Sequence, residues 1–177
     1  MGAEKARQYN RPTPSTLTAH SRTHAMKLAV YNNLAELKPH VGEEVAVSDW
    51  VTITQERINQ FAQATGDHQW IHVDAERAKS SPFGCTIAHG FLTLSLIPNF
   101  SEPSVKVKSI KMGINYGLNK VRFINPVKVN SRVRGRFVLK AFDEIEGGAQ
   151  VTMTVTIEIE GQDKPACVAE SIARRFE

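Results

Sequence analysis

The residues of this chain that best suit chemistry by type and spacing are Asp67 and His72. Because each helical residue turns about 100°, a continuous helix would place side chains five residues apart about 140° from each other. Gly66 comes directly before Asp67, at a position where glycine commonly ends a helix. If the chain turns there, the carboxylate and the imidazole can share one water molecule. This spacing predicts a general acid–base pair, but it also fits a capped helix followed by a surface turn.

At the same place, His68 and His72 have the four-residue spacing of a zinc-binding pair on a helix. The zinc-protease motif has a glutamate directly after the first histidine, whereas this chain has Gln69. The segment is also expected to leave the helix at Gly66. The sequence therefore predicts no metal at this place.

The helix expected before Gly66 would position Asp67. Thr54 is a suitable N-cap, and the residues that follow recur at the spacing of one mostly apolar helical face: Ile58, Phe61, Ala62 and Thr65. Beyond the turn, Asp74 is a fair N-cap for a second short helix.

A buried helix is expected at residues 91–97, which follow Gly90 and are apolar nearly all round. A helix of that kind packs inside a protein rather than on its surface. Pro98 is expected to end it. Closer to the N-terminus, residues 26–37 predict a short amphipathic helix, and residues 44–53 contain strand-like segments around Ser48.

The second half of the chain predicts an antiparallel sheet, with strands at residues 106–115, 121–125, 132–142, 151–159 and 166–174. Residues 151–159 alternate between apolar and polar side chains, which is typical of a sheet with one buried and one wet face. Gly147 and Gly148 suit a hairpin turn. The apolar face needs a cover, and the buried helix is the best candidate. The sequence therefore predicts an α+β fold.

Composition indicates one domain, at residues 26–177, after a flexible polar extension at residues 1–25. The extension carries +3 of the formal net charge of +4, so the domain is nearly neutral and is not expected to bind nucleic acid. No apolar run approaches the ~20 residues of a membrane span. The two cysteines, Cys85 and Cys167, predict a reducing compartment and a cytoplasmic protein.

The segment around Asp67 resembles the signature of the (R)-specific enoyl-CoA hydratases of the MaoC-like dehydratase family. The matching residues are Phe61, Thr65-Gly66-Asp67, Ile71-His72 and Ala78, and residues 86–96 form a second match. The chain departs from the family pattern at Ala64 and at Gln69-Trp70. There it resembles the subgroup related to nodulation protein N.

This resemblance implies a hot-dog fold, in which an antiparallel sheet wraps around a central helix. It implies reversible hydration of a trans-2-enoyl thioester, carried by coenzyme A or acyl carrier protein, to a (3R)-hydroxyacyl thioester. Asp67 and His72 would hold the water, with Asp67 drawing its proton, and the backbone amide of Gly90 would stabilise the charge on the thioester oxygen. Weaker candidates for substrate contacts are Trp70, His89 and Ser95. No cofactor is expected beyond the coenzyme A of the substrate.

The family also implies a homodimer, because a single hot-dog unit leaves sheet edges open. Two other functions remain open from the sequence. One is a hot-dog acyl-CoA thioesterase, which would direct water at the carbonyl instead of the alkene. The other is an acyl-thioester-binding dehydratase partner subunit without turnover of its own. Ser48 lies outside both matching stretches, so Ser48→Ala is expected to be a neutral control.

Overall fold

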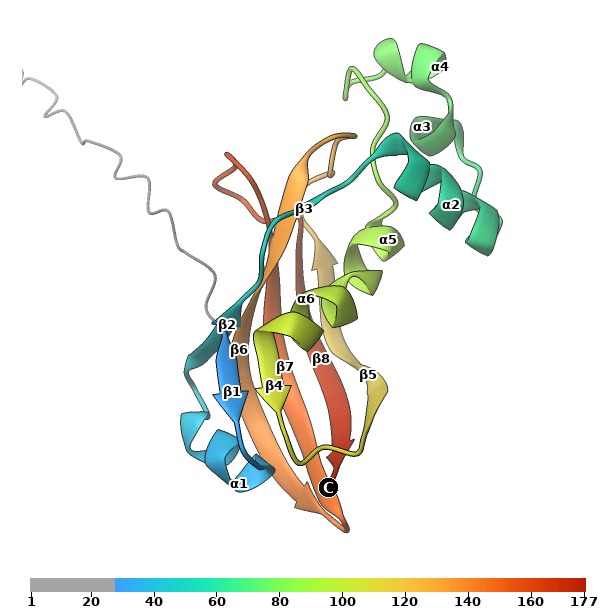
Figure 1. Cartoon of the computed structure of the whole chain (residues 1–177). Helices are drawn as coiled ribbons and strands as arrows, with labels where there is room; N and C mark the ends of the chain where they lie inside the picture. Colours follow the sequence, from blue (N-terminus) through green and yellow to red (C-terminus); the bar gives the residue numbers. More distant parts are fainter. Residues whose placement is uncertain (1–27) are drawn as a thin grey trace, which may run out of the picture.

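The structure is a computed structural model that describes residues 28–177 (Figure 1). The extension expected at residues 1–25 lies outside the described residues, and so does the start of the helix expected at residues 26–37. In the described part, Ala29–Tyr31 is a strand, β1, and only Leu34–Leu37 is helical, α1, so a continuous helix was wrong. The reason is tertiary: β1 pairs in parallel with Val105–Val107, β4, far along the chain.

All of the remaining helices lie before residue 105, and the long strands follow them. After the short 3-10 helix η1 they are β2, β3, α2, α3, α4, α5, α6, β4, β5, β6, β7 and β8. The helices are η1 (Lys38–His40), α2 (Gln55–Thr65), α3 (Trp70–Val73), α4 (Ala75–Lys79), α5 (Gly90–Ser95) and α6 (Ile97–Ser104). The strands are β2 (Glu44–Val47), β3 (Val51–Thr52), β4 (Val105–Val107), β5 (Met112–Phe123), β6 (Arg132–Ile145), β7 (Gly148–Ile159) and β8 (Cys167–Phe176).

The large sheet has the strand order β2-β6-β7-β8-β5, and β3 also pairs with β6. All of its pairings are antiparallel. The expected hairpin at Gly147 is confirmed, with φ of +72°, and β7 follows it. The gap expected between residues 115 and 121 was wrong, because β5 runs through it. Irregular register between Asn115 and Val121 lets the strand stay paired with β8.

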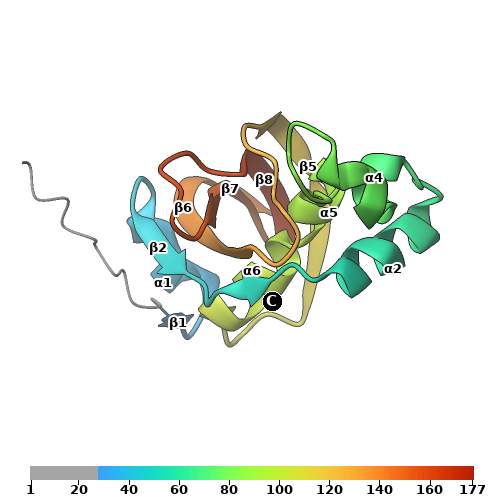
Figure 2. The ribbon, with the colours of Figure 1, turned by 90° about the horizontal axis from the view of Figure 1, so that it is seen from above.

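The expected buried helix is present, but Pro98 does not end it. A first segment, α5, is followed after Leu96 by α6, and Pro98 sits in the first turn of α6, where proline needs no hydrogen-bonded N–H. The segments α5 and α6 lie across one face of the sheet in Figure 1, and the view from above shows the sheet curving around them (Figure 2). The fold is therefore α+β and of the hot-dog type, as expected.

The helix and the sheet lie close together at Gly135 on β6. A Cβ atom at this position would lie 3.0 Å from the Cβ atom of Phe100 on α6 and from the ring of Phe137. Both aromatic side chains are almost fully buried, so neither has free space to move into. Residue 135 must lack a side chain for α6 to sit this close to the sheet.

Helices α2, α3 and α4 gather near one end of the sheet, beside the start of α5 (Figure 1). Their sequence signals are confirmed. The Thr54 hydroxyl accepts a hydrogen bond from the N–H of Arg57, and Gly66 ends α2 in the left-handed conformation with φ of +75°. The Asp74 side chain caps α4 by accepting from the N–H of Arg77. Within residues 28–177, no helix combines the length and apolar character that a membrane span requires.

Ser48 marks the point where the chain passes from β2 to β3 along β6. Its side chain is buried, its oxygen accepts a 2.9 Å hydrogen bond from the N–H of Gly135, and its own N–H donates to the Gly135 carbonyl. The expectation that Ser48→Ala is a neutral control was therefore wrong. The hydroxyl satisfies a buried backbone donor at Gly135, where the helix lies close to the sheet.

We predict that Ser48→Ala lowers the free energy of unfolding by about 1–3 kcal/mol, because it leaves the buried N–H of Gly135 without an acceptor. Chemical denaturation followed by circular dichroism measures the change. Ser80→Ala, an exposed serine after α4, is the matched control and should shift stability by less than about 0.5 kcal/mol. Equal midpoints for the Ser48 variant and the wild type would contradict this account.

Candidate active site

His72 is held on the short helix α3 with its ring buried. Its Nδ1 atom lies 2.7 Å from the carbonyl oxygen of Ile87, so Nδ1 must carry the proton and donate it. The Ile87 segment is fixed in turn, since the Ile87 N–H donates to the carbonyl of Ile71 at 3.0 Å. In the neutral ring, Nε2 is therefore left as a hydrogen-bond acceptor.

Asp67 lies in the connection between α2 and α3, directly after the turn at Gly66, and is exposed. One oxygen of its carboxylate accepts a 3.3 Å hydrogen bond from the N–H of Gln69. One ligand-type atom each from Asp67, His72 and His89 lies within 4.8 Å of the others. The turn at Gly66 thus brings together the carboxylate and imidazole that a continuous helix would hold apart.

His89 is the third member of this cluster, and the sequence had suggested it only as a weak substrate contact. Its Nε2–H donates to the backbone carbonyl of Asp67 at 2.9 Å, and its ring stacks on His72 with centroids 3.7 Å apart. The ring is buried and also contacts Phe61, at 5.0 Å between centroids. His89 therefore holds both residues of the predicted pair. No spacing rule could show this, because Asp67 and His89 are 22 residues apart.

The electrostatics favour a neutral His72. Burial lowers the pKa of His72 below its ordinary value of 6.5, and the neighbouring His89 lowers it further. The hydrogen bond to Ile87 and the charge of Asp67 act in the opposite direction and are the smaller effects overall. Near neutral pH, His72 is consequently a neutral imidazole with a free lone pair on Nε2.

Asp67, His72 and His89 each offer one metal-ligand atom, and these three atoms lie within 4.8 Å of one another, which is close enough to hold a metal ion. Among residues 28–177, no fourth Cys, His, Asp or Glu joins this group. His68, the other half of the zinc-type spacing, is exposed on the connection and is outside it.

A cavity of about 290 Å³ lies beside His72, and Gly90 and Phe123 are also part of its wall. Gly90 is the first residue of α5, so its N–H has no acceptor within that helix. A Cβ atom at position 90 would lie 3.2 Å from the ring of Phe123, which is tighter than ordinary contact. A side chain at position 90 would therefore crowd Phe123 in the wall of the cavity next to His72.

Trp70 and Ser95 do not join this cluster. The half-buried Trp70 ring carries the guanidinium of Arg77 at 4.3 Å, and Trp70 is not part of the wall of the His72 cavity. Ser95 is exposed, and its hydroxyl donates a hydrogen bond to the carbonyl of Leu92 at 2.8 Å. The hydroxyl is thus bonded to the helix backbone and not directed at a substrate. Ser95 lines a different pocket, farther along α5.

A cysteine nucleophile is not favoured at this site. Burial raises the pKa of the Cys167 thiol to about 11, so the thiol is protonated near neutral pH. Cys85 is half-buried and lies outside the Asp67, His72 and His89 cluster. The chemistry that this arrangement supports is proton transfer to and from a water molecule.

The chain is similar to known proteins over most of its length. Residues 36–162 match the family model of the MaoC like domain. The chain is 55% identical over 148 residues to 3-hydroxyacyl-thioester dehydratase Z of Mycobacterium tuberculosis, covering 83% of this chain and 98% of that protein. It is 52% identical over 147 residues to nodulation protein N of Rhizobium meliloti, covering 80% and 89%.

Solved structures with lower sequence identity to this chain have a similar fold. The unliganded R-hydratase PhaJ1 from Pseudomonas aeruginosa has a TM-score of 0.68 at 24% identity, covering 83% of this chain and 87% of that one. The (R)-hydratase from A. caviae has a TM-score of 0.61 at 24% identity, covering 75% and 94%. Fold, signature residues and family model agree, and the chain belongs to the MaoC-like dehydratase family.

Proposed function

We propose that this protein is a 3-hydroxyacyl-thioester dehydratase, a hydro-lyase that reversibly adds water to a trans-2-enoyl thioester to give a (3R)-hydroxyacyl thioester. The observation that carries the proposal is the proximity of the Asp67 carboxylate and the neutral His72 imidazole, whose ligand-type atoms lie within 4.8 Å of each other. The relative that is 55% identical bears this activity in its name. A thioesterase or a partner subunit without turnover would not need both groups.

In the proposed reaction, one water molecule donates its two hydrogen bonds to Asp67 and to Nε2 of His72. The water oxygen bonds to C3 of the alkene, the π electrons move towards the thioester carbonyl, and the resulting charge on that oxygen is met by the N–H of Gly90. The proton that leaves the water passes to the pair and from there to C2. Because Nε2 starts unprotonated, His72 can deliver a proton only after accepting it from the water.

We predict that Asp67→Asn and His72→Gln each lower kcat for crotonyl-CoA hydration by at least about 100-fold, the usual size of a general acid–base contribution. KM should change little, because both residues act on the water. The double variant should lose little more than either single variant, since one proton-transfer unit is already broken. Loss of the enoyl absorbance measures the reaction, and a thiol reagent shows whether any thioester is cleaved.

The matched controls for this test are Asp163→Asn and His68→Gln, which make the same replacements at exposed positions outside the cluster. Both should keep the wild-type kcat. Incubation with EDTA distinguishes metal-dependent chemistry at the three-residue cluster and should leave the rate unchanged. A folded Asp67→Asn protein with near-normal turnover would refute the mechanism, and rapid thiol release would favour the thioesterase.

We predict that His72 makes the folded protein more sensitive to acid. Above about pH 6.5, His72 is neutral in both the folded and unfolded chains; below it, the unfolded chain binds a proton that the folded site resists. The stability that this group contributes is therefore lost as the pH falls. Between about pH 7.5 and 5.5 the wild type should lose more free energy of unfolding than His72→Gln, as measured by urea denaturation. A greater loss in the variant would overturn the assignment.

We also propose that the protein acts as a homodimer joined along β5. This strand lies at the end of the sheet order and exposes large apolar side chains: Met112, Ile114, Tyr116 and Leu118. We predict a dimer by light scattering at micromolar concentration, and a shift towards monomer for Ile114→Lys. Replacement of Lys111, an exposed neighbour, by alanine is the control. A stable, active wild-type monomer would contradict the proposal.

A further inference from the structure

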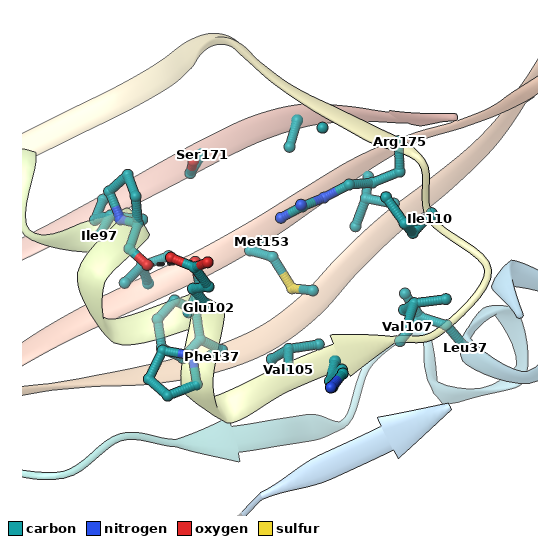
Figure 3. Close-up of a pocket in the computed structure, with 18 of the residues that line it drawn as sticks. Leu37, Ile97, Glu102, Val105, Val107, Ile110, Phe137, Met153, Ser171 and Arg175 are labelled. Carbon is teal, nitrogen blue, oxygen red and sulfur yellow. Dashed lines mark hydrogen bonds between the residues drawn. The ribbon is translucent and has the colours of Figure 1, made fainter. Parts of the chain in front are cut away.

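A second, larger cavity lies away from His72, between α6, β4 and the inner face of the sheet (Figure 3). Its volume is about 720 Å³, which is within the range of small-molecule sites in proteins. Apolar side chains make up much of the wall, among them Ile97, Val107, Phe137 and Met153. Nothing in the proposed proton transfer uses this cavity.

Arg175 brings a positive charge into this apolar space. Its side chain leaves β8 and extends into the pocket in Figure 3. The guanidinium lies over Gly113 of β5, where a Cβ atom would be only 2.6 Å from Nη1. A side chain at position 113 would therefore displace Arg175, so the missing side chain gives the guanidinium its place.

No partner for this guanidinium is present among the described residues. Within residues 28–177 the Arg175 guanidinium has no hydrogen bond or ion pair, although Glu102 is part of the same wall. Other arginines of the sheet are paired: Arg134 bonds to Glu158 at 2.7 Å, and Arg136 to Glu44 at 2.6 Å.

Burial lowers the pKa of Arg175, because its charge is partly removed from water. A guanidinium remains charged at any ordinary pH, and a charge that is partly removed from water is stabilised by a partner of opposite charge. A bound anion would supply that partner, and a carboxylate matches the planar guanidinium with two parallel hydrogen bonds.

A third pocket, of about 440 Å³, adjoins this cavity along α5 and α6. It shares Ile97, Ser101 and Arg175 with the large cavity, and its wall reaches Phe91, the residue after Gly90. Ser101 is eleven positions after Gly90, which corresponds to about 16 Å of helix. An extended chain advances ~1.2 Å per bond, so about a dozen carbon atoms span this path.

We propose that the pocket along α5 and α6 binds an acyl chain of about a dozen carbons that ends in a carboxylate, and that Arg175 recognises this carboxylate. The substrate class is thus an ω-carboxyacyl thioester. The inference rests on the proposed function, since it assumes that the thioester end lies at Gly90. It adds a specificity-determining residue that is remote from the proton transfer.

The test compares two coenzyme A thioesters of equal length, trans-2-dodecenoyl-CoA and its ω-carboxy counterpart, trans-2-dodecenedioyl-CoA. The wild type should show at least about tenfold higher kcat/KM with the ω-carboxy substrate, and Arg175→Met should lose that preference. Arg175→Lys should retain part of it, because the charge remains but the two-point geometry does not. Arg174→Met is the matched control and should keep the wild-type ratio, since Arg174 bonds to Gln150 and covers Tyr116.

Three results separate the possible failures. Equal kcat/KM for the two substrates in a wild type that hydrates crotonyl-CoA would overturn this inference and leave the proposed function intact. Loss of the preference in Arg174→Met as strongly as in Arg175→Met would also overturn it. If the wild type hydrates no enoyl-CoA at all, the proposed function fails. Binding of both thioesters to the Asp67→Asn variant, measured by calorimetry, then decides the role of Arg175 without turnover.

Discussion

The helix formed by α5 and α6 can lie against the sheet because residue 135 has no side chain. With Phe100 and Phe137 buried on either side, any added atom would push the helix outward. The position of that helix fixes two other features at once. Its first residue, Gly90, forms part of the wall beside His72, and its far end covers the cavity that contains Arg175. This close contact in the core thus bears on the walls of both cavities.

The candidate active site depends on a second contact, the hydrogen bond from His72 to the carbonyl of Ile87. This bond decides which ring nitrogen is free, and burial of the ring keeps the imidazole neutral. His89 then links the parts, because it bonds to the backbone of Asp67 and stacks on His72. Asp67 itself stays exposed, where water can reach it.

Signals that act within a few residues could be predicted from the sequence, and those that depend on distant pairing could not. The caps at Thr54, Gly66 and Asp74 are local hydrogen bonds or local backbone geometry, and all three are present. The strand β1 was missed because its partner β4 lies about 75 residues away. The convergence of Asp67 and His72 followed from one glycine, whereas the roles of His89 and Arg175 required the folded chain, since their neighbours come from other elements.

The single free nitrogen of His72 has a consequence for stereochemistry. Only one proton is in transit under the proposed chemistry, and the groups that accept it from the water are those that return it to the substrate. The hydroxyl and the hydrogen must then arrive from the same side of the planar alkene, which is a syn addition. In deuterated water, the deuterium at C2 and the oxygen at C3 would have one fixed relative configuration. The relative configuration at C2 and C3 of the product would thus depend on the hydrogen bond to Ile87, because that bond leaves Nε2 of His72 unprotonated.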